Sequence, residues 1–163
     1  GVTLRIKAGT TIDFVGDYKI IVYGRILIEG TIEQPVLFGM ETNIWGGIRL
    51  INADMGSTLQ HTQIYAATVG LVAAESNVTV EDCLFAHNRI GFHVLNSVPI
   101  LKGCIFQENL IYGVKEDDGA APTVINCSFI NNHTIDYYED QLGIISIDQL
   151  NELGHNKQNM VIK

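Results

Sequence analysis

Apolar and polar residues alternate along most of this chain with the two-residue period of a β-strand. Val, Ile, Thr and Phe dominate the alternating runs, and these residue types favour strands. In the segment 78–98, the positions expected to point inward are Val78, Val80, Phe85, Phe92 and Val94. The pattern therefore predicts short strands, each buried on one face.

The pattern returns at a nearly constant step along the chain. Three columns of equivalent positions mark the repeat: Thr62, Cys83, Cys104 and Cys127; Ile64, Phe85, Phe106 and Phe129; Ala67, Asn88, Asn109 and Asn132. A glycine that allows a tight corner precedes the next short strand in three repeats, at Gly70, Gly91 and Gly113. A fixed period of this size, about 21 to 23 residues, predicts one structural unit that is repeated and stacked.

Four coils stand out, at residues 57–77, 78–98, 99–121 and 122–140. The segment 1–56 alternates in the same way, with longer turns and a longer period of about 25 residues. Within it, Glu41–Ile44 is predicted to form a protruding loop.

After Asp140 the repeat fades, and Ile147–Leu153 has helical spacing. We expect Asp148 to cap the start of this helix and Gly154 to end it, with a closing strand at Met160–Ile162. Terminal units of a stack are atypical because they must cover its apolar end.

The chain thus divides into coils at 1–140 and a C-terminal cap segment at 141–163. It starts at Gly1 without a signal segment, which favours a mature or excised fragment of a longer solenoid.

In a stack of parallel strands, like residues lie on like. We expect the Phe column to stack ring over ring, and the Asn column to pass side-chain amides from coil to coil. The three cysteines are not at zinc-binding spacing. They are expected to form a buried column of free, reduced thiols that pack as small hydrophobes.

The charge and the hydropathy of the chain argue against two classes of partner, nucleic acids and membranes. It has 18 acidic and 10 basic residues, a formal charge of −8 and no basic stripe, so nucleic-acid binding is not expected. No apolar run approaches the roughly 18 residues of a membrane span.

Several segments resemble right-handed parallel β-helix proteins of the pectin-lyase-like superfamily, of the type found in bacterial surface and secreted proteins. The Cys/Phe/Asn/Gly coils carry this resemblance together with Gly1-Val2-Thr3-Leu4, Ala8-Gly9-Thr10, Gly30-Thr31, Pro35-Val36-Leu37-Phe38 and Trp45-Gly46-Gly47-Ile48. The resemblance implies an all-β fold, a single-stranded right-handed parallel β-helix (solenoid) of about 21–25 residues per coil. It also implies an extracellular or cell-surface location. The fold hosts lyases, hydrolases, epimerases, adhesins and inert spacers, so it does not choose among activities.

Catalytic candidates are few. His61 is expected above Asp82, and His87 above Glu108 with Arg89 nearby. A lyase of this superfamily would need clustered carboxylates for calcium, and no acidic column forms here. A glycosidase would need two carboxylates about 5 to 9.5 Å apart, for which the candidates are Glu81 with Asp54 and Glu108 with Asp136.

The densest acidic segment is Glu116-Asp117-Asp118-Gly119, which we expect in a loop formed by the two-residue insertion of its coil. Glu116 replaces the apolar Val94, and Asp136 stands where Phe92 would be, counted from the cysteine. If any ligand binds, we expect it on the lateral face or loops of the last two coils, at Glu116, Asp117, Asp118, Asp136, Tyr137, Tyr138, Glu139 and Asp140.

No resident metal or cofactor is expected, and a weak calcium site between these acidic loops is the alternative that stays open. Among the aromatic residues available to a glycan, Trp45 is expected to pack inside a turn, whereas Tyr65 and Tyr112 remain available.

The leading hypothesis is a non-catalytic scaffold that contacts a polysaccharide or another surface protein. The alternative is a polysaccharide lyase or glycoside hydrolase whose site is completed by coils outside this chain. A third class is end-to-end stacking with further coils or another chain.

Overall fold

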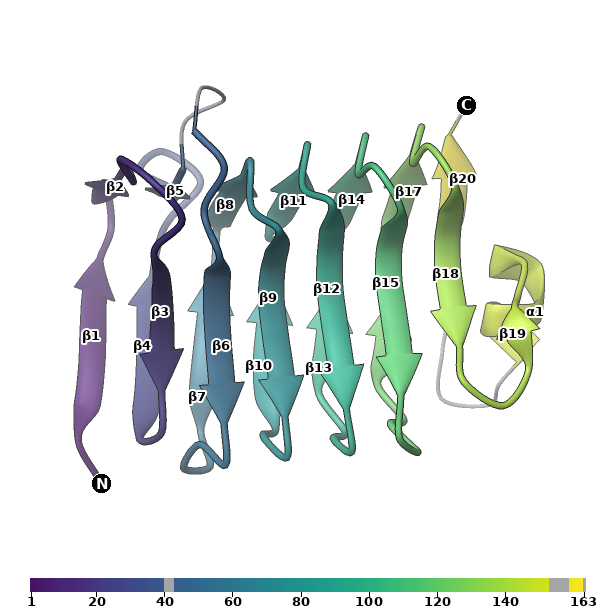
Figure 1. The fold of residues 1–163 in the computed structure, drawn as a ribbon, viewed down its shortest axis with the longest axis horizontal. Helices are drawn as coiled ribbons and strands as arrows, with labels where there is room; N and C mark the ends of the chain where they lie inside the picture. Colours follow the sequence, from purple (N-terminus) through teal and green to yellow (C-terminus); the bar gives the residue numbers. More distant parts are fainter. Residues whose placement is uncertain (40–42, 153–158, 163) are drawn as a thin grey trace.

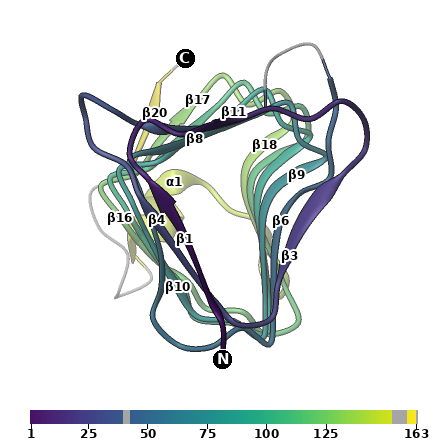
Figure 2. The same ribbon diagram turned by 90° about the vertical axis from the view of Figure 1, so that its left-hand side faces the viewer.

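The computed structural model describes residues 1–39, 43–152 and 159–162. Short strands from successive coils pair in parallel and form three sheets that run along the long axis (Figure 1). Seen along this axis, the coils enclose a triangular core (Figure 2). The chain winds clockwise away from the viewer, so the β-helix is right-handed, as predicted.

Sheet A has six strands among the described residues, in the order β1 (Thr3–Lys7), β4 (Arg25–Glu29), β7 (Ser57–Gln60), β10 (Val78–Glu81), β13 (Ile100–Lys102) and β16 (Thr123–Ile125). Sheet B has seven, in the order β2 (Thr11–Ile12), β5 (Val36–Phe38), β8 (Thr62–Tyr65), β11 (Leu84–Ala86), β14 (Ile105–Gln107), β17 (Ser128–Ile130) and β20 (Met160–Ile162).

Sheet C also has seven, in the order β3 (Lys19–Val22), β6 (Gly47–Ile51), β9 (Val69–Ala74), β12 (Ile90–Leu95), β15 (Tyr112–Asp117), β18 (Ile135–Glu139) and β19 (Gly143–Ile144). The last pair of this sheet, β18 with β19, is antiparallel, so β18 is the last parallel strand of sheet C.

The register between neighbouring coils follows the predicted repeat. Phe85 of β11 pairs with Ile64 of β8 and with Phe106 of β14. The Phe85 and Phe106 rings stack at a centroid distance of 5.2 Å, and Phe129 continues the stack at 5.2 Å from Phe106. The predicted ring-over-ring column is confirmed.

The two-residue insertion of the third coil is split between two turns. In sheet B Phe85 pairs with Phe106, in sheet C Phe92 pairs with Val114, and in sheet A Leu101 pairs with Val124. The step in residue number between paired positions therefore grows by one from sheet B to sheet C, and by one more from sheet C to sheet A. One extra residue precedes β15 and the other follows it, whereas the sequence suggested a single loop.

The core holds the side chains that alternate inward, and the five positions predicted for the second coil are all buried. Cys83, Cys104 and Cys127 are buried and free, as predicted. The Cys83 and Cys104 thiols lie 3.5 and 3.4 Å from the backbone oxygens of Leu59 and Val80. Burial raises the pKa of the Cys104 thiol well above its usual value.

At each corner of the triangle, the chain turns through a residue in the left-handed region of backbone conformation. The corner between sheets A and B has His61, Asp82, Gly103 and Asn126; that between B and C has Ala66, His87, Glu108 and Asn131; that between C and A has Asn52, Glu75, Asn96 and Asp118. Their φ angles lie between 42° and 63°. The same conformation returns in each coil, so it belongs to the architecture of the turns.

The C-terminal segment contains helix α1 (Ile147–Glu152), whose Ile147 and Leu150 are buried against the end of the core. Figure 2 shows α1 within the triangular outline of the coils. The predicted cap at Asp148 is wrong. The Ser146 hydroxyl accepts the Gln149 amide N–H, and the Gln149 side chain accepts the Ser146 N–H, which is a capping box.

Strand β20 then pairs in parallel with β17 and extends sheet B. Gly154 lies outside the described residues, and so do Glu41 and Thr42 of the predicted loop Glu41–Ile44; the other two loop residues, Asn43 and Ile44, are exposed. The division of the chain at residue 140 stays a prediction.

Candidate functional site

A groove of about 640 Å³ runs along the corner between sheets B and C. It crosses several coils and is lined by Ile44, Ala66, Ala67, Thr68, His87, Asn88, Arg89, Glu108, Leu110 and His133. We call it the corner groove. Two of the four predicted catalytic candidates, His87 and Glu108, lie in it.

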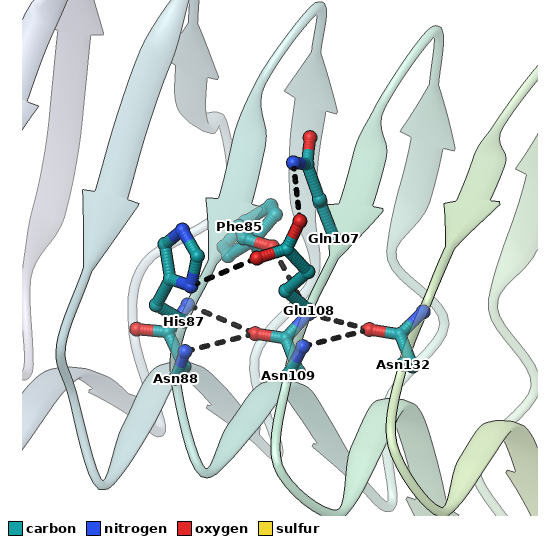
Figure 3. Close-up of polar contacts among 7 residues, drawn as sticks. All are labelled: Phe85, His87, Asn88, Gln107, Glu108, Asn109 and Asn132. Atoms are coloured by element: carbon teal, nitrogen blue, oxygen red, sulfur yellow. Dashed lines mark hydrogen bonds and ion pairs between the residues drawn. The ribbon is translucent and has the colours of Figure 1, made fainter.

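A ladder of buried amides supports the floor of the corner groove (Figure 3). Asn88 donates its backbone N–H and its side-chain amide to Oδ1 of Asn109, at 3.1 and 3.2 Å. Asn109 donates in the same way to Oδ1 of Asn132, at 3.1 and 2.9 Å. The Asn109 amide also donates to the Phe85 carbonyl at 3.0 Å. The predicted amide ladder is confirmed, and it fixes the backbone on which His87 and Glu108 stand.

His87 and Glu108 occupy equivalent corner positions of adjacent coils, so their side chains lie next to each other on the outer surface (Figure 3). Nδ1 of His87 is 3.4 Å from Oε2 of Glu108. The Gln107 side-chain amide donates to Oε1 of Glu108 at 3.1 Å. The His87 and Glu108 side chains are 42% and 36% exposed, so water screens the pair strongly.

Arg89 and His133 add basic groups to the corner groove, while Glu108 is the single carboxylate of its described lining. The Asp136 carboxylate, the predicted partner of Glu108, accepts instead from the Asn132 amide at 2.9 Å. The other predicted glycosidase pair is Glu81 with Asp54. Glu81 contacts Gln60 and Lys102, and Asp54 contacts the amino terminus. Within the described residues, no group of three or more His, Cys, Asp or Glu side chains is placed to hold a metal ion.

The second pair of predicted catalytic candidates is His61 with Asp82. Both residues line a smaller pocket of about 300 Å³ at the corner between sheets A and B. The Asp82 carboxylate lies over the next corner residue, Gly103, where an added Cβ would stand only 2.3 Å from Oδ1. The structure therefore brings His61 and Asp82 to one pocket.

The acidic residues predicted to form one patch are separated. Glu116 and Asp117 belong to strand β15, not to a loop. Glu116 pairs in register with Val94 and points into the core, where it is only 4% exposed. Tyr137 is fully buried and donates its hydroxyl to Oε1 of Glu116. The predicted surface position of these two residues, Glu116 and Tyr137, is wrong.

The register also corrects the alignment of Asp136. Tyr137 continues the inner column of Phe92 and Val114, because Phe92 pairs with Val114 and Val114 with Tyr137. Asp136 lies above Gly113, which is one position earlier. Counting from the cysteine failed because the turns before β15 and β18 each hold one residue more than the turn before β12.

The remaining acidic residues lie in two places. Asp118 and Asp140 meet at the corner between sheets C and A, where Oδ2 of Asp140 accepts the Asp118 N–H at 3.2 Å. Glu139 ends β18 beside this corner, whereas Asp136 lies at the start of the same strand. Ligand binding at any of these residues stays a prediction.

Asp117 and Tyr138 lie on the outer face of sheet C, with two residues that sequence reasoning missed. Nε2 of His93 is 2.7 Å from Oδ2 of Asp117, and Lys115 pairs with the same oxygen. The Lys115 ammonium also lies 5.6 Å from the centre of the Tyr138 ring. The signal was available in the coil period, which places His93, Lys115 and Tyr138 in one outward column.

Trp45 packs inside, as predicted. It is fully buried, its ring stacks on Phe14 at 4.0 Å, and its Nε1–H donates to the Tyr65 carbonyl at 2.7 Å. It is therefore not a platform for a sugar ring.

Comparison with protein families matches residues 10–159 to the right-handed β-helix region. This match covers most of the chain and agrees with the three parallel sheets. The chain belongs to this family. Neither the curated proteins nor the solved structures contain a significant match to this β-helix. In the described part of the β-helix, α1 is far too short to cross a membrane, and no other helix is present that could do so.

Proposed function

We propose that this β-helix is a non-catalytic scaffold of an extracellular or cell-surface protein, and that it presents the corner groove to a polysaccharide. The observation that supports the absence of catalysis is the position of the four catalytic candidates. His61, Asp82, His87 and Glu108 all stand at corner positions with positive φ. In other coils the same positions hold Ala66, Gly103, Asn126 and Asn131.

Corner geometry accounts for the residue types of His61, Asp82 and His87 without a catalytic role. Asn, Asp and His are enriched several-fold among residues with positive φ. A corner residue also points away from the core, so a polar side chain is tolerated there. Two of the candidates then meet because coils stack about 4.8 Å apart.

The corner groove suits a polysaccharide because it combines polar and apolar lining over several coils. Ligand sites are mostly apolar, with a few polar groups that fix orientation. Here the apolar lining includes Ala66 and Leu110, and the polar groups are His87, Arg89 and Glu108. A span of four coils corresponds to roughly 15 Å, enough for a few sugar rings.

The enzyme alternative is favoured by one observation, the contact between His87 and Glu108. In that case Glu108 would orient His87 as a general base, and the chemistry would depend on both groups. Stacking of this β-helix on another chain also stays a prediction.

The test is incubation of the protein with acidic and neutral polysaccharides, followed by analysis for unsaturated or reducing-end products and by amide NMR. We expect shifts around the corner groove and no products. Glu108→Gln should weaken binding at least several-fold. Asp82→Asn, at the equivalent corner between sheets A and B, is the matched control and should leave binding unchanged. Turnover that is lost in Glu108→Gln or Asp82→Asn would overturn the scaffold proposal.

A further inference from the structure

A second hollow, of about 450 Å³, lies on the outer face of sheet C and adjoins the corner groove. It is lined by Thr68, Val69, Arg89, Ile90, His93, Ile111, Tyr112 and Lys115. We call it the sheet C pocket. It shares Thr68 and Arg89 with the corner groove, but its other strand residues come from β9, β12 and β15.

The lining of the sheet C pocket is basic, although the protein carries a charge of −8. Arg89, His93 and Lys115 contribute to it, and no carboxylate is among the described lining residues. Arg49 lies in the same outward column as His93, two coils away. Lys115 and His93 share one carboxylate, that of Asp117, which stands outside the lining.

Asp117 holds two of these groups in place from outside the lining. It accepts from Nε2 of His93 at 2.7 Å and pairs with the Lys115 ammonium. This contact sets the tautomer of neutral His93 with the proton on Nε2, and leaves Nδ1 as its second nitrogen. Burial raises the pKa of Asp117, but the hydrogen bonds from Lys115 and His93 outweigh it and keep the pKa below its usual value.

Burial and the neighbouring positive charges disfavour protonation of the His93 ring. Burial is the main cause that lowers the pKa of His93, and the positive charges of Lys115 and Arg49 lower it further. Only the contact with Asp117 acts in the opposite direction. A bound anion would relieve this repulsion, because it would neutralise the basic groups that converge here.

We propose that the sheet C pocket binds a tetrahedral oxyanion, the phosphate or sulfate group of a ligand. Arg89, His93 and Lys115 reach the pocket from a turn and two different strands, so they can contact three oxygens of one group. A planar carboxylate has two oxygens, which a single arginine fork already satisfies. This inference goes beyond the proposed function, because the polysaccharide of the corner groove need carry no such group.

Binding should be linked to protonation of His93. In the free protein Nδ1 carries no proton, so it cannot donate to an oxyanion. When the anion binds, His93 takes up one proton from solvent and donates from Nδ1 to the anion and from Nε2 to Asp117. Affinity should therefore rise as the pH falls through the range in which histidine titrates.

The probes are inorganic sulfate, glucose 6-sulfate, glucose 6-phosphate, glucuronate and glucose, titrated into the protein by calorimetry and by NMR of the His93 ring. Sulfate esters serve for the pH comparison because their charge does not change between about pH 6 and pH 8. We expect saturable binding of the sulfate and phosphate esters, several-fold tighter at pH 6, with proton uptake and a shift of the His93 signals.

Arg89→Gln should weaken sulfate-ester binding about tenfold or more, and His93→Gln should abolish its pH dependence. Lys102→Gln removes an equivalent charge from sheet A and should change nothing. Arg89 is exposed, so its replacement should leave the melting temperature unchanged. The proposal is overturned if neither ester binds saturably, if glucuronate binds as well as the esters, or if Lys102→Gln weakens binding as much as Arg89→Gln. If the wild-type protein binds the esters but no polysaccharide at the corner groove, the proposed function is contradicted and the inference about the sheet C pocket stands.

Discussion

At the scale of single residues, backbone conformation at the corners decides which side chains are tolerated. A left-handed conformation costs an ordinary residue roughly 1–2 kcal/mol, because its Cβ crowds the following carbonyl. Glycine avoids this cost, and β-branched residues suffer it most. Asp82, with φ 51°, and Gly103, with φ 63°, share one corner column.

This comparison leads to a first prediction. Asp82→Gly should leave the free energy of unfolding unchanged or raise it by up to about 1 kcal/mol, whereas Asp82→Val should lower it by about 1–2 kcal/mol. Urea denaturation of both variants measures the difference. If valine is tolerated as well as glycine, backbone strain does not select the corner residues.

The second residue-scale prediction concerns Glu116. Burial raises the pKa of Glu116 to about 7 from 4.5, the hydrogen bond from Tyr137 opposes this change, and the charge of Glu139 adds to it. The folded protein therefore holds this proton more tightly than the unfolded chain. The resulting stabilisation is complete below about pH 4.5 and is lost as the pH rises to about 7.

The loss should amount to roughly 3 kcal/mol, following the free energy of a pKa shift. Urea melts of the wild type and of Glu116→Gln, measured between about pH 4 and pH 8, isolate it, because the other groups titrate alike in both proteins. We expect the difference in unfolding free energy between the two proteins to change by this amount in favour of Glu116→Gln as the pH rises. A difference that does not vary with pH would show that Glu116 is not buried as a neutral acid.

At the scale of elements, the stability of each strand depends on the equivalent strands above and below it. Phe106 lies between Phe85 and Phe129 and is fully buried. Its neighbour Ile105 points outward from the same strand and is 37% exposed. The two positions test whether a side chain matters through its place in the stack.

Phe106→Ala should lower the free energy of unfolding by about 3–5 kcal/mol, because the stacked rings on either side cannot close the cavity. Ile105→Ala should cost less than about 1 kcal/mol. Urea melts supply both values. A cost under about 1 kcal/mol for Phe106→Ala would contradict its position in the column.

The amide ladder leads to a similar prediction for the free energy of unfolding, in which the contribution comes from hydrogen bonds. Asn109→Ala removes the acceptor of the Asn88 backbone N–H and of one Asn88 side-chain N–H, and the amide that donates to the Phe85 carbonyl. The Asn88 amide keeps its bond to the Ile64 carbonyl. Each buried unpaired group costs about 1–3 kcal/mol, so a loss of about 3 kcal/mol or more is expected. Alanine itself fits the column, since Ala67 occupies it one coil before Asn88.

The control is Asn77→Ala, which removes one hydrogen bond, from the Val98 N–H, at an exposed position. It should cost about 1 kcal/mol or less. Equal costs for the two alanine variants in thermal melts would show that the ladder adds nothing beyond an ordinary turn.

At the scale of the whole molecule, coils contact only their neighbours, so stability is a sum over coils and the interfaces between them. Cys83, Cys104 and Cys127 report on three successive coils from inside the core. Cys127 lies next to the cap segment, where the Asn159 side chain accepts its backbone N–H at 2.8 Å.

We expect none of the three thiols to react with N-ethylmaleimide in the native protein. In moderate urea, Cys127 should be labelled first and Cys83 last, because opening of the cap exposes the last coil. Mass spectrometry of peptides after pulses of labelling gives the order. Labelling of Cys83 before Cys127 would show that the cap end is not where unfolding begins.

The sequence by itself determined the repeat, and through it most of the fold. The columns of Cys, Phe and Asn predicted the register, the ring stack and the amide ladder, because in parallel coils like residues must lie on like. The helix was predicted in place, but its cap was assigned to Asp148 because the Ser146–Gln149 capping box was overlooked.

Only the tertiary structure decided which of the acidic residues point into the core and which point outward from the sheets. A shift of one residue in register moves a strand's side chains to the opposite face. The extra residue in the turn before β18 places Asp136 one position away from the inner column, and it puts Tyr137 inside with Glu116. The sheet C pocket likewise depends on three residues from separate turns and strands of consecutive coils. Their convergence follows from the stacking of the coils, which single residues along the chain do not reveal.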